Sequence, residues 1–177
     1  KVVVALLGEV IPESYENLFS YGAQTVCLVK NDLLGRSNTD AFVFASKEVF
    51  DKFNPEIVLF PKTDLGRDVG PRLAFKLGVP VAQDCIDLGI DQDTKKVIVT
   101  RPVYGGNAIA TLVFEDVDTQ IVIVRPKVFE PITPIENCKG ELIELNIDLD
   151  EKLISLEMKT SGVIPPPPYT VLPCLVL

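Results

Sequence analysis

The chain has 177 residues, 47% of them hydrophobic and 24% charged, which is typical of one folded domain or a domain with an appendage and excludes a disordered segment or a membrane protein. Acidic residues outnumber basic ones by 25 to 17, and the resulting net charge of −8 argues against a nucleic-acid partner, which needs a basic surface. The sequence has no histidine, so catalytic triads, Cys/His dyads and most zinc and haem sites are excluded.

The first half of the chain alternates apolar strands with amphipathic helices. Runs rich in Val, Ile and Leu without polar alternation predict strands buried on both faces, at residues 1–7, 25–30, 56–60 and 79–82. Apolar residues at helical spacing predict helices over 13–21, 39–53 and 65–77, ended by Gly22, Pro55 and Gly78. This alternation implies right-handed crossovers and predicts an α/β fold, a parallel sheet with helices on both faces.

The second half lacks helical periodicity. Strands are predicted at 86–90, 97–103, 108–114 and 121–124, with candidate turns at 91–94 and 115–118, so we expect an antiparallel strand extension of the parallel sheet. Residues 141–149 alternate between apolar and polar side chains and predict a half-buried strand. Asn146, Asp148 and Asp150 resemble the start of a calcium loop, but Glu151 stands where that loop needs glycine.

The end of the chain and the cysteines suggest no chemistry. The prolines at 165–168 must be extended, and no function is assigned to the apolar tail after them. Each cysteine lies among Val, Ile or Leu and none forms a CxxC pair, so we expect buried, reduced and structural thiols rather than reactive ones at Cys27, Cys85, Cys138 and Cys174.

The location of the protein is also an expectation from sequence. No charged-then-apolar leader opens the chain, and no apolar run approaches the ~20 residues of a membrane span, so we expect a cytoplasmic protein without membrane insertion. Because residue 1 is Lys rather than Met, we expect a processed chain or part of a longer protein.

The first of three candidate functional segments spans residues 61–73, between the third strand and the third helix. Open α/β sheets place ligands at this end of the strands, and free N–H groups at a helix start attract anions. Gly66 and Gly70 would allow close approach of a ligand, and Arg67 and Arg72 would add positive charge.

A simpler interpretation needs no ligand for this segment. Thr63 or Asp64 would cap the helix, and the two arginines would pair with Asp64 and Asp68.

The second candidate segment is Thr-Arg-Pro-Val-Tyr-Gly-Gly-Asn-Ala at residues 100–108. Gly105, Gly106 and Asn107 are well suited to a tight hairpin turn, which is the simpler interpretation. Arg101 and Tyr104 beside them suit a flat anionic ligand or a partner protein. The third segment, residues 119–126, repeats the Arg-Pro pair at its end.

Taken in order, these segments resemble the alpha subunit of electron transfer flavoproteins. The resemblance is most specific at Leu-Gly-Arg-Asp-Val-Gly-Pro-Arg-Leu-Ala, residues 65–74, and covers about the first 130 residues. The other matching strings lie at 1–9, 21–23, 26–29, 84–88, 100–107 and 124–129.

The resemblance implies how the chain is organised. Residues 1–130 would form the N-terminal domain, of the adenine nucleotide alpha hydrolase-like kind. Residues 131–177 would be a strand extension and Pro-rich tail that starts the linker to an FAD domain absent from this chain. Lys1 would align with the family's second strand, so that the first strand and its helix lie outside these residues.

The resemblance also implies function. The chain would pair with a beta subunit that binds AMP or a second FAD, and the heterodimer would carry electrons from an acyl-CoA or other dehydrogenase through FAD to an acceptor. It would be an electron carrier subunit rather than an enzyme, with no catalytic or metal-binding residue. The candidate cofactor-binding residues are Arg101, Tyr104, Gly105, Gly106, Asn107, Gly66 and Arg67.

An alternative is a stand-alone adenine-nucleotide-binding module resembling the universal stress proteins, which share the alternating strand and helix pattern. Such a module needs a Gly-rich phosphate loop late in the sheet, and the sequence shows none.

Overall fold

The computed structural model describes residues 1–35, 38–150 and, as backbone only, 172–176. The helical elements are η1 (Glu13–Glu16), α1 (Asn17–Ser20), η2 (Asp32–Gly35), α2 (Thr39–Phe53), α3 (Asp64–Leu77) and η3 (Tyr104–Gly106). The strands are β1 (Val3–Gly8), β2 (Thr25–Lys30), β3 (Ile57–Pro61), β4 (Val81–Cys85), β5 (Asp87–Ile90), β6 (Val97–Val103), β7 (Ala108–Val113), β8 (Gln120–Val124), β9 (Glu141–Glu144) and β10 (Leu172–Val176).

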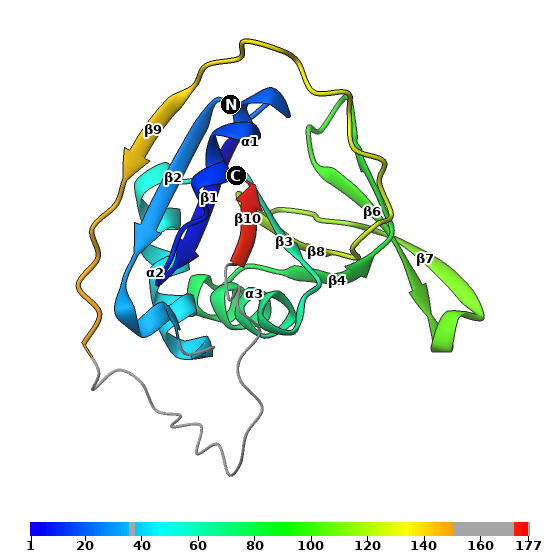
Figure 1. The fold of residues 1–177 in the computed structure, drawn as a ribbon. Helices are drawn as coiled ribbons and strands as arrows, with labels where there is room; N and C mark the ends of the chain where they lie inside the picture. Colours follow the sequence, from blue (N-terminus) through cyan, green and yellow to red (C-terminus); the bar gives the residue numbers. More distant parts are fainter. Residues whose placement is uncertain (36–37, 151–171, 177) are drawn as a thin grey trace.

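Seven strands form the main sheet, in the order β4-β8-β3-β10-β1-β2-β9 (Figure 1). Neighbouring strands are parallel except at β10, which runs antiparallel to both β1 and β3. The predicted α/β fold is therefore confirmed, and its sheet is parallel as predicted except at β10, an antiparallel strand that the sequence does not predict.

Helices α2 and α3 cover one face of this sheet. Their apolar stripes pack with alternate residues of β1, β2, β3 and β8 in one core, where Phe42, Phe60 and Leu73 are fully buried. A Cβ atom at Gly70 would lie 2.8 Å from Ile123 Cδ1, so α3 approaches β8 closely because residue 70 is a glycine.

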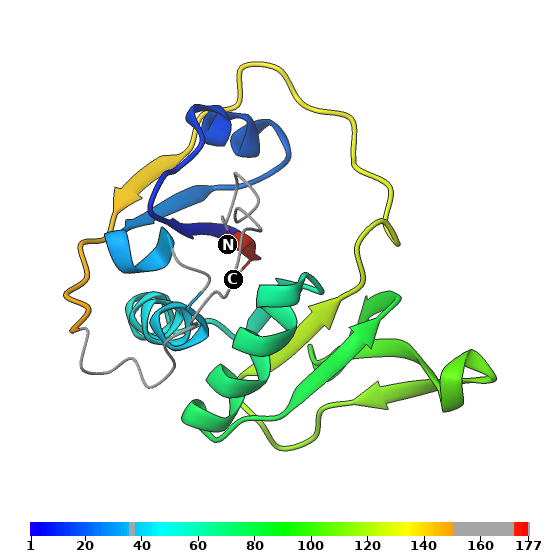
Figure 2. The same cartoon turned by 60° about the horizontal axis from the view of Figure 1, so that its bottom comes forward.

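The opposite face has two different covers. The short helices η1 and α1 pack over β1 and β2, with Phe19 at the centre of that contact. The remainder of the face, at β3, β8 and β4, is covered by a three-stranded antiparallel sheet, β5-β6-β7, through Val97, Val99 and Phe114 (Figure 2). Helices thus lie on both faces as predicted, but the long ones lie on a single face.

The second half of the chain corrects one expectation. Only β5, β6 and β7 form the antiparallel extension; β8 returns to the main sheet, parallel to β3 and β4, and β9 pairs parallel with β2. The run at 121–124 is apolar throughout because it is covered on both faces. Gln120 joins the two sheets, since its buried Oε1 accepts a 2.6 Å hydrogen bond from the Val97 N–H.

Two predicted elements are shorter than expected. The helix predicted at 13–21 is divided into η1 and α1, and neither has a side-chain cap. The strand predicted at 141–149 forms a ladder only to Glu144, although its alternation of burial continues to Asp150. Beyond β9, the Leu145 N–H still donates to the Leu28 carbonyl at 2.8 Å.

The cysteines agree in part with the prediction. Cys27 and Cys85 are buried and free, and burial raises the pKa of each thiol to about 11, while Cys138 is half-buried. The side chain of Cys174 and the prolines at 165–168 lie outside the residues described. Among the described residues, no helix is long and apolar enough to cross a membrane.

Candidate functional site

The carboxyl ends of β3, β8 and β4 bring three charged residues together. Lys62 follows β3, Arg125 follows β8, and Asp84 is the penultimate residue of β4. Two backbone hydrogen bonds fix their positions, from the Lys62 N–H to the Val124 carbonyl at 2.7 Å and from the Arg125 N–H to the Cys85 carbonyl at 2.9 Å. This edge is where open α/β sheets bind ligands.

Asp84 is the centre of the cluster. Arg125 Nε and Nη2 donate to its two carboxylate oxygens at 2.9 and 2.8 Å, and Lys62 Nζ lies 2.7 Å from Oδ1. The Arg125 hydrogen bond, supported by Lys62, lowers the pKa of Asp84 from its usual 3.8 to about 2. Asp84 is therefore ionised at neutral pH, with both oxygens occupied.

A cavity of about 500 Å³ lies beside this cluster, lined by Asp84, Arg125 and residues 101–106. Arg101 lies on β6 opposite Ala110, in register with Val97 and Val99 on the face that packs against the main sheet. Its Nε is buried and has no hydrogen-bond partner among the described residues.

The loop between β6 and β7 forms the far wall of the cavity. Its backbone is left-handed at three successive residues, Tyr104 (φ 50°), Gly105 (φ 67°) and Gly106 (φ 95°), and Asn107 Nδ2 closes it by donating to the Tyr104 carbonyl at 3.0 Å. The tight hairpin predicted here is confirmed, and the turn alone accounts for both glycines. The Tyr104 side chain is 84% exposed at the rim.

The first candidate segment has a structural explanation for most of its features. Thr63 caps α3, because its Oγ1 accepts a 3.0 Å hydrogen bond from the Gly66 N–H. Gly66 is required by packing, since a Cβ atom there would lie 2.0 Å from the Pro61 carbonyl oxygen. Neither Gly66 nor Arg67 is among the residues that line the cavity, and Lys62 is the residue of this segment that joins the cluster.

The arginines of this segment are paired within the chain. Arg67 lies 3.5 Å from Asp64 and 3.9 Å from Asp68, as the simpler interpretation predicts. Arg72 instead reaches α2, where its Nη1 donates to Asp40 Oδ1 at 2.9 Å.

Sequence reasoning missed the Asp84 cluster. In the sequence, Arg125 stands out only because it repeats the first Arg-Pro pair, and Lys62 only because it belongs to the first segment. One feature of the sequence could have indicated Asp84, because its carboxylate follows a short apolar run. Parallel strands end at a common edge of the sheet, which is where open α/β sheets bind ligands.

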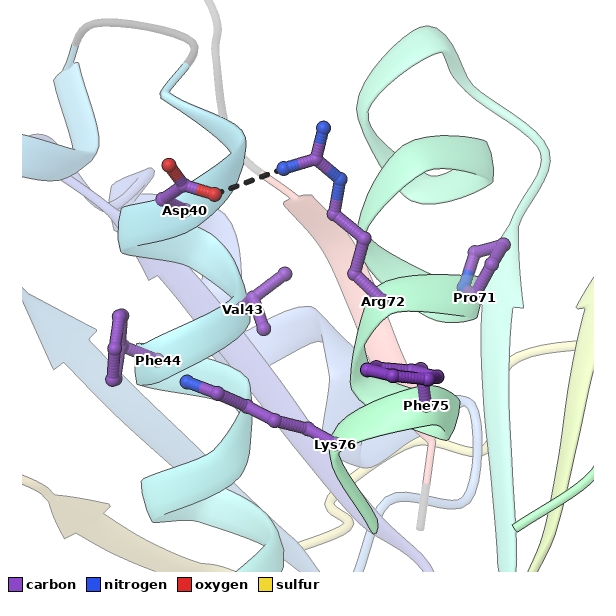
Figure 3. Close-up of a pocket in the computed structure, with 7 residues that line it drawn as sticks. All are labelled: Asp40, Val43, Phe44, Pro71, Arg72, Phe75 and Lys76. Carbon is purple, nitrogen blue, oxygen red and sulfur yellow. Dashed lines mark hydrogen bonds and ion pairs between the residues drawn. The ribbon is translucent and has the colours of Figure 1, made fainter. Parts of the chain in front are cut away.

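A second cavity, of about 420 Å³, lies between α2 and α3 and is mostly apolar (Figure 3). Val43, Phe44 and Phe75 line it, and Lys76 Nζ lies 3.3 Å from the centre of the Phe44 ring. Phe75 is 88% exposed. Among the described residues, no group of His, Cys, Asp and Glu side chains could hold a metal ion, here or elsewhere.

Comparison with known proteins gives a consistent family. A model of the electron transfer flavoprotein domain matches residues 1–150. The electron transfer flavoprotein subunit alpha of Clostridium acetobutylicum is 36% identical over 132 residues, which are 75% of this chain and 39% of that protein. The subunit alpha of Thermoanaerobacterium thermosaccharolyticum is 31% identical over 92% of this chain and 51% of its own length.

Other relatives carry different names. Protein FixB of Clostridium saccharobutylicum is 32% identical over 93% of this chain and 50% of its own length. The acryloyl-CoA reductase electron transfer subunit beta of Anaerotignum propionicum is 27% identical over 93% of this chain. The chain spans about half the length of these relatives or less. The family model and the identities together place this chain in the electron transfer flavoprotein family, as its resemblance to the alpha subunit predicts.

Proposed function

We propose that this chain is the N-terminal domain of an electron transfer flavoprotein alpha subunit, which scaffolds a heterodimer that passes electrons through FAD from a dehydrogenase to an acceptor. The observation that supports this most directly is the family match over residues 1–150, with relatives named as alpha subunits at 31–36% identity. The proposal includes an electron carrier role without catalytic residues and a cytoplasmic location. The domain would belong to the adenine nucleotide alpha hydrolase-like class, with residues 131–177 starting the linker to an FAD domain.

The loop from Arg101 to Asn107 is proposed as the edge of the domain that faces the cofactor. Arg101 Nε is buried and has no hydrogen-bond partner within residues 1–35 and 38–150, which fits an anionic group there. FAD supplies the redox chemistry, and the role of the protein is to position it and to set its electrostatic environment. A guanidinium beside a flavin favours its anionic reduced forms, so Arg101 would raise the reduction potential.

The share of FAD held by this domain is proposed to be small. Most flavin contacts would come from the part of the subunit outside this chain, while the beta subunit would bind AMP or a second FAD. Because a partial site must offset an association cost of at least ~4 kcal/mol, the chain purified alone is expected to be colourless. Stoichiometric flavin absorbance after gel filtration would contradict this division of contacts.

Binding to the beta subunit encoded in the same genome is the central test. Isothermal titration calorimetry at micromolar concentrations should show one beta subunit bound per chain. No heat of association, with both proteins folded, would count against the heterodimer.

The reconstituted heterodimer then tests the loop. The substitution Arg101→Ala should lower the potential or the occupancy of the nearest flavin, whereas Arg72→Ala, which removes an arginine paired with Asp40, should leave both unchanged. If flavin content, reduction potentials and electron-transfer rate were all unchanged in the Arg101 variant, the loop would be only a turn without a role at the cofactor.

The stand-alone nucleotide-binding module is not favoured by the family match. Mass spectrometry of copurifying ligands separates the two functions, because ATP without a second protein would indicate the module, and FAD with a second subunit the heterodimer.

A further inference from the structure

We infer that the cavity beside Asp84 is an oxyanion site of this chain itself, in which Arg101 binds a phosphate or carboxylate group carried by a larger molecule. This deepens the proposed function and rests on it, because the cavity includes the loop proposed to face the cofactor. The site is built from elements of both sheets, since Asp84 and Arg125 come from the main sheet and Arg101 from β6.

The charges around the cavity do not cancel. Lys62, Arg101 and Arg125 are cations, and Asp84 is the acidic residue in contact with two of them. Its carboxylate is already shared between Arg125 and Lys62, which leaves Arg101 without an ion pair to any described carboxylate. In a chain with a net charge of −8, this is a local excess of positive charge.

The burial of one Arg101 nitrogen, Nε, shows why this excess of positive charge matters. An exposed guanidinium satisfies its donors with water, but Arg101 Nε is buried and lacks a hydrogen-bond partner among the described residues. Buried donors without an acceptor are rare in native proteins, because the cost of desolvation is not recovered. An anionic oxygen in the cavity would supply the missing acceptor and the missing negative charge together.

The size and rim of the cavity indicate the kind of molecule. A volume of about 500 Å³ is in the range of small-molecule sites and much larger than one phosphate or carboxylate group requires. The exposed Tyr104 ring at the rim and the open space around Gly105 and Gly106 leave room for the body of the ligand. The anionic group would therefore be the inner end of a larger ligand.

Nuclear magnetic resonance of the 15N-labelled chain tests the site, because a buried Nε–H exchanges slowly and can be observed directly. The probes are inorganic pyrophosphate for phosphate and succinate for carboxylate, each compared with sodium chloride at the same ionic strength. We expect the Arg101 Nε–H signal to shift saturably with pyrophosphate or succinate and not with chloride. The probe that saturates at lower concentration identifies the source of the oxyanion.

Matched variants separate binding from general charge effects. Arg101→Gln should weaken binding of the effective probe at least tenfold, followed on the Arg125 Nε–H signal, whereas Arg72→Gln should leave the affinity within twofold. No saturable shift with either probe, or equal weakening in both variants, would overturn the site. Since beta-subunit binding is measured separately by calorimetry, a chain that binds the subunit but neither anion would refute this inference alone.

Discussion

The two segments that combine glycines with arginines, residues 61–73 and 100–108, differ in how completely the fold uses them. In the first, Gly66 is explained by the nearby Pro61 carbonyl, and both arginines are paired with carboxylates of the same chain. In the second, the turn explains the glycines, but Arg101 has a buried nitrogen without a hydrogen-bond partner in the described part of the chain. Glycine and arginine at a strand end therefore do not mark a binding site by themselves, and the proposed site at Arg101 is argued from its unpartnered nitrogen instead.

The largest expected effect tests whether Gly66 is structural. Gly66→Ala should lower the free energy of unfolding by ~3 kcal/mol or more, because the new Cβ would meet backbone rather than a movable side chain. Gly105→Ala is the matched change in the second segment, where the Cβ enters open space and only the φ of 67° is unfavourable, at about 1–2 kcal/mol. Urea denaturation measures both, and equal losses would remove the contrast between the segments.

The Asp84 cluster should give the next largest effect. Asp84→Asn should cost about 1–2 kcal/mol at neutral pH, because Arg125 and Lys62 lose their ionised acceptor while the Asp84 side chain is only 22% exposed. Asp64→Asn, at a side chain 98% exposed, should cost at most about 0.5 kcal/mol.

The lowered pKa of Asp84 determines how the effect of Asp84→Asn on stability changes with pH. Because folding lowers the pKa of Asp84 from 3.8 to about 2, its stabilisation is fully present above the unfolded value and is lost as the pH falls through the folded one. The stability difference between wild type and Asp84→Asn should be constant at neutral pH and shrink between about pH 4 and about pH 2. A difference independent of pH over this window would show that the ionised carboxylate is not its source.

A smaller effect is expected from the helix cap of the first segment. Thr63→Ala should cost about 1 kcal/mol, because the Gly66 N–H loses its acceptor, and Thr63→Ser should retain most of the stability. A loss as large in the serine variant as in the alanine variant, in the same urea experiment, would rule out capping as the cause.

The smallest effect is expected at Arg101. Arg101→Gln should change stability by no more than about 0.5 kcal/mol, since the Arg101 side chain makes no ion pair or hydrogen bond with the described residues. Arg125→Gln should cost more, because it breaks the two hydrogen bonds to Asp84. If Arg101→Gln unfolded the chain, Arg101 would be a structural residue and the contrast between the two segments would fail.

The sequence predicts individual helices and strands of this fold better than it predicts which strands pair with one another. Burial on both faces is visible in the runs at 1–7 and 25–30, and Thr63 and Gly78 lie at the two ends of α3, as predicted. The place of β8 in the sheet cannot be predicted from the local sequence, because the choice of partner strand depends on residues far away in the chain. Parallel strands are usually connected through a helix, whereas here the sheet β5-β6-β7 makes the connection from β4 to β8.

The same limit applies to the candidate site. Local chemistry predicts Arg101 and Tyr104 as candidates, because they lie beside a turn in the sequence, and both line the same cavity. The contact of Asp84 with Arg125 spans 41 positions and depends on β4 and β8 ending side by side, which no local pattern reveals. Only the structure shows that Arg125 is paired with Asp84, whereas Arg101 has no ion pair with any described residue.

The antiparallel strand β10 has a consequence for the order of folding. It separates β1 from β3, so among the described strands no hydrogen-bonded ladder joins the group β1-β2-β9 directly to the group β3-β8-β4. Its register pairs Val4 with Val176, near opposite ends of the sequence, and loop closure over such a separation is slow. During synthesis both groups can form before residues 172–176 leave the ribosome. The centre of the sheet would therefore be the last part to close.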